Sequence, residues 1–419
     1  MLPDQVSVLV AGGGASGFMT AIVAAEAGAA DVHLLEATPE PLQKVRISGG
    51  GRCNVTHACW DPRSLVGHYP RGSKALRGPF SRFATGDAVA WFADHGLELV
   101  EEDDGRLFPR SNSSESVVAS LRQAARRAGV QLHTATALQH VEPAGSGFVC
   151  RLRQGGSLRS VHCRQLVLAT GAHPSGRQLA AALGHTIVPP VPSLFSLSLA
   201  GPALQGLAGV AMDPVDLSLE LDGSGAKRFQ QSGAVLITHR GLSGPALLRL
   251  SAFAARDLQA SGYRAQLQVN WAGGRSLGQL DALLEDCRLQ QARRQLGSWR
   301  PWSELSRRLW LQLLAAAGLN PQLRWADLRR AQQQLLVQAL GASRYCVAGR
   351  GPFGEEFVTA GGVDLGEVNL ATMASRLCPG LQLVGELLDV DGVTGGFNFQ
   401  HCWTSGWLAG QALGVQSAD

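Results

Sequence analysis

Val6-Ser-Val-Leu-Val-Ala11-Gly12-Gly13-Gly14-Ala15-Ser16-Gly17 is the stretch that decides the fold. Its first half reads as a buried strand, its glycines have the spacing G-x-G-x-x-G, and residues 18–27 fit a helix that Gly28 ends. Asp31-Val-His-Leu-Leu-Glu36 then predicts a second strand that finishes on a carboxylate, about 20 residues beyond the loop. Together these features predict a Rossmann-like dinucleotide-binding fold.

Each residue type in this loop has a physical task. Gly12 permits the tight turn, Gly14 lets a pyrophosphate approach the backbone, and Gly17 lets the helix pack on the strand. Glu36 can accept hydrogen bonds from both hydroxyls of an adenosine ribose, which favours FAD or NAD over NADP. The predicted cofactor residues of this first stretch are Gly12, Gly14, Ala15, Ser16, Gly17 and Glu36.

A second glycine-rich stretch follows, Lys44-Val-Arg-Ile-Ser48-Gly-Gly-Gly-Arg52-Cys-Asn54. Three successive glycines between polar residues predict a loop that folds over an anion with backbone donors and one fixed charge. The alternative is a flexible surface loop. The predicted cofactor residues here are Lys44, Ser48, Gly49, Gly50, Gly51, Arg52, Cys53 and Asn54.

The C-terminal part holds a third stretch, from Gly385 to Trp403, in which acids precede glycines and a helix start. Acids suit hydroxyls, and a helix N-terminus suits a developing negative charge, so the stretch fits a flavin with its ribityl chain. Among Glu386, Asp389 and Asp391, we favour Asp391 for the ribityl and pyrophosphate region. The buried strand 166–169 adds two positions where backbone passes close to the cofactor. The predicted residues are Thr170, Gly171, Gly385, Glu386, Asp391, Gly395, Gly396, Phe397 and Asn398.

Between these stretches lies an insertion that begins at the prolines of residues 189–192. Alternating segments at 194–199, 215–221 and 265–270 predict a small antiparallel sheet or barrel. Leucine patterns predict helices from Ser276 to Gly297, from Pro301 to Gly318, and from Asn320 onward. The predicted fold is therefore α/β, a Rossmann-like three-layer domain interrupted by a small β subdomain and a helical subdomain. The predicted ranges are 1–190 and 359–419 for the cofactor domain, 191–272 for the β subdomain, 273–342 for the helical subdomain, and 343–358 for a return strand.

Charge is concentrated in the helical part. The whole chain has a formal net charge of +4, whereas residues 273–342 contain ten arginines and five acids, a net charge of +5. Trp299, Trp302, Trp310 and Trp325 lie in the same segment. Arginine with interleaved tryptophan suits RNA backbone contacts and base stacking. The alternative is a helical subdomain with tryptophans in its core and solvated arginines.

Composition indicates an ordinary globular protein, and no apolar run approaches the ~18–20 residues of a membrane helix. The eight cysteines form no CxxC pair, which favours reduced thiols and a cytoplasmic protein. The histidines are scattered without ligand spacing, so we predict no metal site.

Several blocks of sequence resemble one family across nearly the whole chain. They are ISGGGRCNVTH (from Ile47), GRLFPRS (from Gly105), ITHRGLSGPALL (from Ile237), TAGGVDL (from Thr359), TMASRLCPGLQLVGELLDVDG (from Thr372) and GGFNFQHCWTSG (from Gly395). These blocks are similar, in order, to the BaiN/RdsA-type (YhiN-like) family of FAD-dependent oxidoreductases. The resemblance implies FAD, a split dinucleotide domain and a substrate-facing insertion. It also implies a choice of substrates, because the family includes a ribosomal-RNA dihydrouridine synthase branch, reductases of steroid-like enones, and enzymes described as amine oxidases.

The chain departs from the family pattern after Pro174. Many members carry a longer glycine- and threonine-rich loop there, whereas this chain continues directly through Ser175-Gly176-Arg177.

The predicted activity is hydride transfer from reduced FAD to an electron-poor C=C, with a uridine of ribosomal RNA as the leading substrate implied by the family. Cys53 is the candidate proton donor, with a pKa that Arg52 could lower. An equally open alternative is that Cys53 only packs in its loop, and Cys402 is a second choice of donor. The chain lacks a second G-x-G-x-x-G, so NAD(P)H would dock transiently as electron donor. Two other functions stay open: a flavin-dependent amine oxidase that forms peroxide, and a flavin-bound RNA-binding or assembly factor without turnover.

Overall fold

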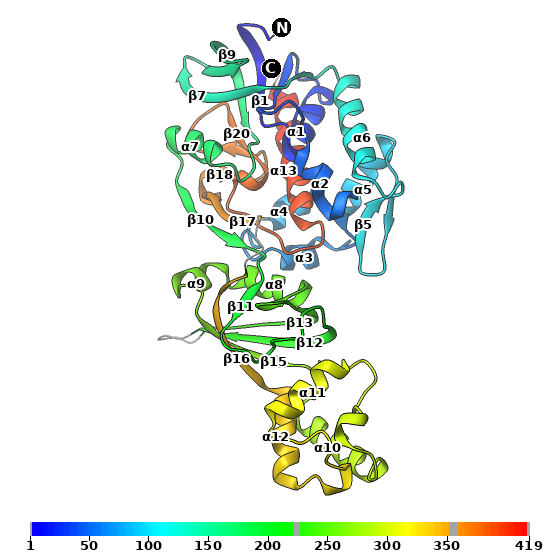
Figure 1. Cartoon of the computed structure of the whole chain (residues 1–419). Helices are drawn as coiled ribbons and strands as arrows, with labels where there is room; N and C mark the ends of the chain where they lie inside the picture. Colours follow the sequence, from blue (N-terminus) through cyan, green and yellow to red (C-terminus); the bar gives the residue numbers. More distant parts are fainter. Residues whose placement is uncertain (1, 222–226, 352–357, 417–419) are drawn as a thin grey trace. The chain divides into compact units, whose positions relative to one another are not determined.

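A computed structural model describes residues 2–221, 227–351 and 358–416 of the chain (Figure 1). These residues form two compact units, one from residues 1–190 and 359–419 and an inserted unit from residues 191–358. The boundaries fall at β10 (Ile187–Ser193) and β17 (Val358–Val363), which pair with each other. No helix among the described residues is long and apolar enough to cross a membrane.

The first unit contains most of the regular structure. Its strands, besides β10 and β17, are β1 (Gln5–Ala11), β2 (Val32–Leu35), β3 (Thr56–His57), β4 (Leu99–Glu101), β5 (Arg106–Pro109), β6 (Gln131–His133), β7 (Thr136–Ala144), β8 (Gly147–Gln154), β9 (Ser157–Leu168), β18 (Val368–Asn369), β19 (Ala374–Ser375) and β20 (Leu381–Leu383). Its helices are α1 (Ala15–Glu26), α2 (Gln43–Gly51), α3 (Pro62–Leu65), α4 (Arg77–Phe80), α5 (Thr85–Asp94), α6 (Ser114–Arg127), α7 (Pro174–Ala182) and α13 (Phe397–Gln416).

The main sheet of the first unit follows the order β18-β19-β20-β9-β1-β2-β6. The strands β20, β9, β1, β2 and β6 are parallel, and Ala11 pairs with both Leu35 and Leu168. Since parallel strands end together, β1, β2, β9 and β20 all finish at one edge of the sheet. The predicted site residues that follow these strands therefore meet at that edge, where ligands bind in open α/β sheets. The predicted Rossmann-like α/β fold is confirmed.

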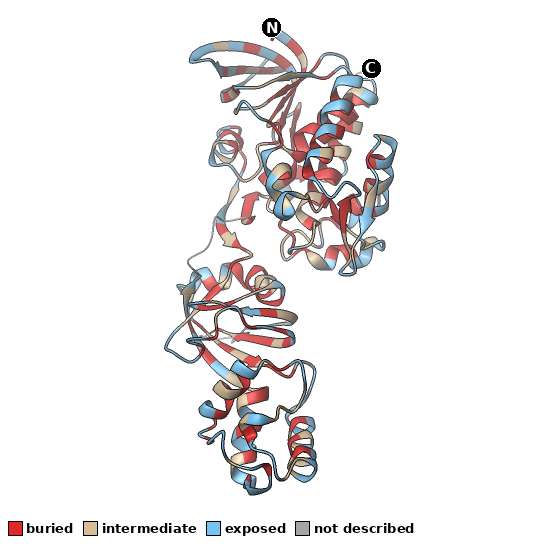
Figure 2. Ribbon diagram, turned by 45° about the vertical axis from the view of Figure 1, so that its right-hand side comes forward, coloured by how far each residue is buried: buried red, intermediate tan, exposed pale blue. Residues whose placement is uncertain are grey.

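Three glycines of α13 bring this helix close to α1, and both helices are labelled in Figure 1. Figure 2 shows buried residues, in red, along the strands and helices of the first unit. A Cβ added at Gly406, Gly410 or Gly414 would lie 2.8, 2.7 or 2.3 Å from atoms of Ser16, Val23 and Ala27 respectively. The contacts ascend together along both helices, so α1 and α13 run parallel. Since Gly406 lies beside Ser16, α13 begins roughly 12 Å before α1 does. The N-terminus of α13 therefore lies before the N-terminus of α1 along the common direction of the two helices.

The inserted unit is built on a closed barrel in the order β11-β14-β13-β12-β15-β16. Its elements are β11 (Leu197–Leu199), β12 (Ala211–Glu220), β13 (Arg228–Ile237), β14 (Gly241–Ser243), α8 (Pro245–Phe253), α9 (Ala255–Ala260), β15 (Ala265–Asn270), α10 (Leu277–Gln290), α11 (Arg307–Ala316), α12 (Arg330–Gly341) and β16 (Ser343–Arg350). All described barrel pairings are antiparallel. Residues 352–357, the end of the predicted return strand, lie outside the described residues.

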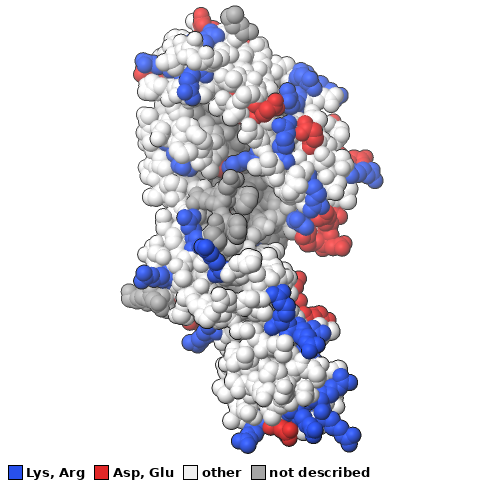
Figure 3. Space-filling model, in the orientation of Figure 1, with Lys and Arg blue, Asp and Glu red and all other residues white. Residues whose placement is uncertain are grey.

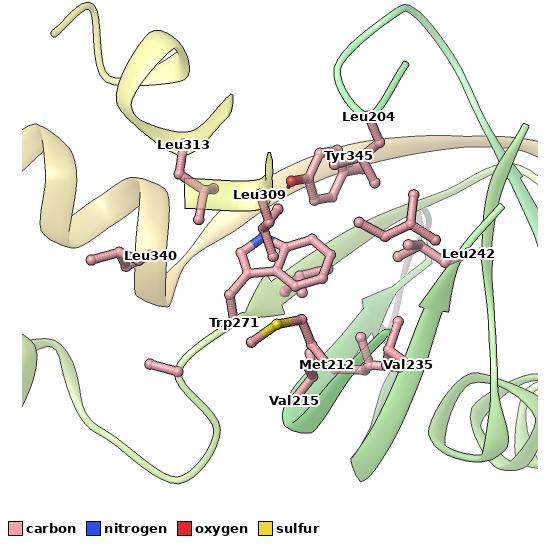
Figure 4. Close-up of a cluster of buried hydrophobic side chains, with 14 of the residues drawn as sticks. Leu204, Met212, Val215, Val235, Leu242, Trp271, Leu309, Leu313, Leu340 and Tyr345 are labelled. Carbon is pink, nitrogen blue, oxygen red and sulfur yellow. Dashed lines mark hydrogen bonds between the residues drawn. The ribbon is translucent and has the colours of Figure 1, made fainter. Parts of the chain in front are cut away.

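Barrel and helices share one hydrophobic core. Figure 4 shows Trp271, fully buried, between Met212 and Val215 of the barrel and Leu309 and Leu340 of the helices. The indole Nε1 of Trp271 donates to the Tyr345 hydroxyl at 3.3 Å, so its polar atom is satisfied inside the core.

The predicted helix boundaries in this unit were wrong. Residues 291–306 and 320–329 lie outside the long helices, because residues 292–297 hydrogen-bond to residues 321–326. Leu296 N donates to Leu323 O at 2.8 Å, and Trp325 N donates to Arg294 O at 2.9 Å. These amides are therefore not available to continue a helix.

Candidate cofactor and active site

In the first glycine loop, Gly12 and Gly17 are in close contact with backbone atoms, whereas the space beside Gly14 is open. A Cβ at Gly12 would lie 2.3 Å from Ala169 O, and one at Gly17 would lie 1.8 Å from Gly12 O. Gly12 also has a φ of 122°, in the region that favours glycine. By contrast, a Cβ at Gly14 would meet nothing within 4 Å. Gly14 precedes the first turn of α1, which has no side-chain cap and no acidic residue, so its amides suit an anion.

Glu36 is held against this loop by backbone donors. Its Oε2 accepts from Gly13 N at 3.0 Å, and its Oε1 accepts from Thr38 N at 2.7 Å. The Thr38 hydroxyl donates to the same Oε1 at 2.7 Å. The carboxylate is thereby fixed beside the glycine loop, where the sequence predicted it.

Glu386 is the C-terminal acid that reaches the same edge of the sheet. It forms an ion pair with Lys44 at 2.7 Å, and its Oε2 lies 3.6 Å from the position of a Cβ at Gly171. The preceding Gly385, with a φ of 67°, lies against Ser16, since a Cβ there would lie 2.5 Å from the Ser16 hydroxyl. Five predicted residues from four segments of the sequence therefore come together.

Asp391, the acid favoured from the sequence, has a different environment. It is fully buried and paired with Arg71 through two hydrogen bonds. A buried carboxylate in such a pair stabilises the local fold only while both partners remain. Asp389 likewise accepts from Gly361 N at 3.0 Å. Asp391 is thus engaged by Arg71, whereas Glu386 lies beside Gly171 and Lys44, so the geometry favours Glu386, and the choice of the acid that faces the cofactor stays a prediction.

The start of α13 is preceded by Gly395 and Gly396, which have φ values of 125° and 92°. A Cβ at Gly396 would lie 2.7 Å from the backbone of Thr56, so β3 approaches closely here. The Asn398 side chain bonds both the N–H and the carbonyl of Gly392, at 2.8 and 2.9 Å. Asn398 thus shapes the turn before the helix.

Aromatic side chains surround the ring of Phe397. His68 stacks on it with a centroid distance of 4.2 Å, and His57 lies tilted at 4.7 Å. The Tyr69 hydroxyl donates to Phe397 O at 2.6 Å. His57 also contacts Gly395 O through Nδ1 at 3.2 Å, and burial lowers the pKa of His57, so it is mainly neutral at pH 7.

The stretch predicted as an anion loop is partly helical, because it forms α2 with a kink at Ser48, Gly49 and Gly50. Arg52 is engaged by other groups: it pairs with Glu102 at 2.6 Å and lies over the Phe108 ring at 4.0 Å. This explains why Arg52 does not act on the Cys53 thiol as expected.

Cys53 is fully buried and has a φ of 61°. Burial raises the pKa of its thiol to about 12, with a smaller opposing effect from a hydrogen bond to Ser48. The lowering that Arg52 could have caused is not found, because loss of hydration dominates at the buried thiol and Arg52 pairs with Glu102. Burial also raises the pKa of Cys402, the second candidate.

Three buried polar atoms at this edge lack a hydrogen-bond partner among the described residues: Asn54 Oδ1, Thr170 Oγ1 and His401 Nδ1. Buried polar groups are normally paired, so each of these atoms indicates a place for a further polar group. Asn54 and Thr170 are predicted cofactor residues. Together with the open side of Gly14, these atoms fit an extended polar cofactor along the edge.

Sequence reasoning did not assign a role to His401 within the C-terminal stretch, and it missed four residues that lie around that stretch: His57, His68, Tyr69 and Arg71. His401 is fully buried within α13, and burial lowers its pKa to about 4. A helical pattern marks His401 as buried, but only the tertiary contacts associate the others with this site. The described residues contain no group of three His, Cys, Asp or Glu able to hold a metal ion.

The fold and this edge define a flavin-dependent oxidoreductase. The family model for the HI0933-like protein Rossmann domain matches residues 6–412, so the chain belongs to the HI0933-like family. The chain is an FAD-dependent oxidoreductase of the BaiN/RdsA type, as its sequence blocks indicated.

Two curated relatives match over nearly their whole length. The 3-dehydro-bile acid delta(4,6)-reductase of Clostridium scindens is 30% identical over 417 residues, which is 96% of this chain and 98% of the relative. The ribosomal RNA dihydrouridine synthase of Escherichia coli is 29% identical over 428 residues, which is 98% of both chains.

A solved structure shares the fold. The 3-ketosteroid-delta4-(5alpha)-dehydrogenase from Rhodococcus jostii has a TM-score of 0.51 at 16% identity, over 99% of this chain and 98% of that one.

Proposed function

We propose that the protein reduces an electron-poor C=C and that its substrate is a uridine in ribosomal RNA, which becomes dihydrouridine. One curated relative is named a bile acid reductase and another a dihydrouridine synthase. Both names describe hydrogen added to a C=C next to a carbonyl. Reduction of such a bond is therefore the chemistry that the relatives have in common.

The observation that carries the RNA substrate is the charge of the helical part. The ten arginines of residues 273–342 outnumber five acids, and most of these arginines are exposed. The phosphates of an RNA backbone are neutralised by such an arginine surface, whereas a steroid-like substrate carries no comparable series of negative charges.

The chain's own residues would hold FAD at the edge of the sheet. Gly14 and the first amides of α1 would face the pyrophosphate, Glu36 the adenosine ribose, and Glu386 the ribityl side, while the start of α13 would face the ring. When bound and reduced, FAD supplies a hydride to one carbon of the C=C.

Cys53 remains the predicted proton donor for the neighbouring carbon. Its raised pKa keeps the thiol protonated at neutral pH but makes it a weaker acid than a free thiol, and the proton it donates would be regained from solvent. Its side chain is fully buried, so donation requires the turn between α2 and β3 to open when substrate binds. A Cys53→Ala variant that kept full turnover would remove it from this role.

Anaerobic titration of the purified flavoprotein with NADH and NADPH tests the reductase. We expect one of them to bleach the flavin absorbance, and ribosomal RNA lacking the modification should then reoxidise it. Mass spectrometry of the RNA should find one uridine heavier by two hydrogens. RNA that stays unchanged while the flavin is reduced would exclude this substrate, and rapid peroxide formation with small amines would instead favour an oxidase.

A further inference from the structure

We infer that an arginine face of the inserted unit is a docking surface for a single-stranded or looped segment of RNA. The arginine face is defined by Arg288, Arg293, Arg294, Arg324, Arg329 and Arg330. This inference rests on the proposed RNA substrate, but the surface itself is argued from its own contacts.

The backbone ladder between residues 292–297 and 321–326 brings the arginines together. Gln295 and Arg324 form a β-bridge, and Ala326 N donates to Ala292 O at 3.1 Å. The segment that contains Arg293 and Arg294 therefore lies beside the segment that contains Arg324, although about thirty residues separate them in the sequence. The second segment continues directly into Arg329 and Arg330 at the start of α12.

The acids beside the arginine face are partly neutralised. Asp281 accepts two hydrogen bonds from Arg330, at 2.8 and 2.7 Å, and Glu285 accepts two from Arg288, at 3.0 and 2.5 Å. These arginines lower the pKa of both carboxyl groups. Asp286 and Asp327 are exposed carboxylates of the same region.

Three arginines of the face are not held in an ion pair within the part of the chain that the structure describes. Arg293, Arg324 and Arg329 are exposed and form no ion pair with any other described residue. A hollow of about 310 Å³ has Arg288, Arg329 and Arg330 in its wall, together with the carboxylates of Glu285 and Asp327. Figure 3 shows Lys and Arg side chains gathered on the visible surface of this helical part. A chain of phosphates complements such a surface.

Planar side-chain groups on this part of the protein favour a single-stranded RNA segment over a duplex. The Arg294 guanidinium lies 4.6 Å from the ring centroid of Trp299, and that of Arg275 lies 5.1 Å from Trp302. Both tryptophans are half-buried, whereas Trp310 and Trp325 are fully buried and stacked within the core. Guanidinium groups held flat on aromatic rings offer faces for unpaired bases, which a duplex keeps stacked inside.

Fluorescence anisotropy with a labelled single-stranded oligoribonucleotide tests the surface without any turnover. The test variant is Arg293→Gln, Arg324→Gln and Arg329→Gln combined. The matched control is Arg122→Gln, Arg127→Gln and Arg153→Gln, three exposed arginines of the first unit that also lack an ion pair among the described residues. Bound flavin absorbance and melting temperature check the fold of each variant.

We expect the test variant to bind about 100-fold more weakly at 0.1 M salt, with a salt slope smaller by about 2, since each lost phosphate contact removes about 0.7 from the slope. The control should bind like the native protein. Asp327→Asn should tighten binding by about five-fold on the same basis, a gain that misfolding cannot produce.

Equal binding by the native protein and the test variant would overturn the inference, as would equal loss in both triple variants. Preference for a duplex of the same sequence would remove the single-stranded assignment. If only binding to anionic lipid vesicles depends on the arginine face, its partner is a membrane and the inference fails. Uridine reduction is measured separately, so RNA binding by the arginine face can still be interpreted if the proposed function fails.

Discussion

The loop at residues 12–17 and the stretch at residues 385–396 serve the same edge of one sheet, yet they differ in how the sequence specifies them. In the first loop, glycine spacing corresponds directly to backbone contacts: Gly12 lies on Ala169 and Gly17 lies on Gly12. The second stretch contains three acids that could face the ribityl and pyrophosphate region, and their spacing in the sequence does not show which one does. The three acids differ in their partners: Asp391 pairs with Arg71, Glu386 pairs with Lys44, and Asp389 accepts a hydrogen bond from the backbone of Gly361.

This difference teaches where local sequence suffices. A tight turn depends on atoms a few bonds apart, so its residue types are fixed by local geometry. A carboxylate's role depends on which cation reaches it, and both cations here lie more than 300 residues away. The predictions below test this contrast at both stretches.

The largest effect is expected at Gly17. Gly17→Ala places a Cβ 1.8 Å from Gly12 O, so we expect a loss of stability above about 3 kcal/mol, at the upper end for overpacking, and little soluble protein. Gly14→Ala, whose Cβ meets nothing, should fold normally and retain less flavin. Soluble yield, melting temperature and the ratio of flavin to protein absorbance measure both. A stable Gly17→Ala protein would contradict the close contact.

Asp391→Asn should destabilise the protein by about 3 kcal/mol, because it leaves Arg71 buried without its charged partner. Glu386→Gln should cost less than about 1 kcal/mol, since Lys44 is largely exposed, but it should weaken flavin retention. Urea unfolding and flavin dissociation separate the two. The reverse pattern would restore Asp391 as the cofactor acid.

His401 should make stability pH-dependent. Its pKa is about 4 in the folded protein, below the ordinary value of 6.5. Between these values the unfolded chain binds a proton that the folded chain excludes, so stability falls as pH drops below 6.5 and levels off below about 4. From pH 7 to pH 5.5 we expect a loss of about 1 kcal/mol.

Urea unfolding of the native protein and His401→Gln at both pH values measures this contribution. The variant should show a smaller loss between pH 7 and pH 5.5. Equal losses would assign the effect to another group, such as His133, whose pKa is also lowered by burial.

The smallest effect is expected at Arg52. Its pair with Glu102 is partly exposed, so Arg52→Met should cost less than about 1 kcal/mol and leave flavin retention unchanged. A clear loss of flavin from this variant, at unchanged melting temperature, would return Arg52 to the cofactor residues.

Much of the fold followed from local pattern. The alternation of β12 and β15 and the strand–loop–helix of residues 5–26 are short-range signals, and the structure confirms these strands and this helix. The helices of residues 276–329 were misplaced because a leucine pattern cannot report that residues 292–297 pair with residues 321–326. His57 and Tyr69 escaped notice for the same reason, since their association with Phe397 spans more than 300 residues.

The sequence by itself determined the dinucleotide fold, the positions of its glycines and the family, because these depend on residues that are close along the chain or on blocks kept in order. Only the tertiary structure decided that Glu386 pairs with Lys44 and Asp391 with Arg71, that Cys53 is buried with a raised pKa, and that residues 292–297 pair with residues 321–326. Charge pairing, hydration and proximity are set by what surrounds a residue in space, and distant segments of the chain supply those surroundings.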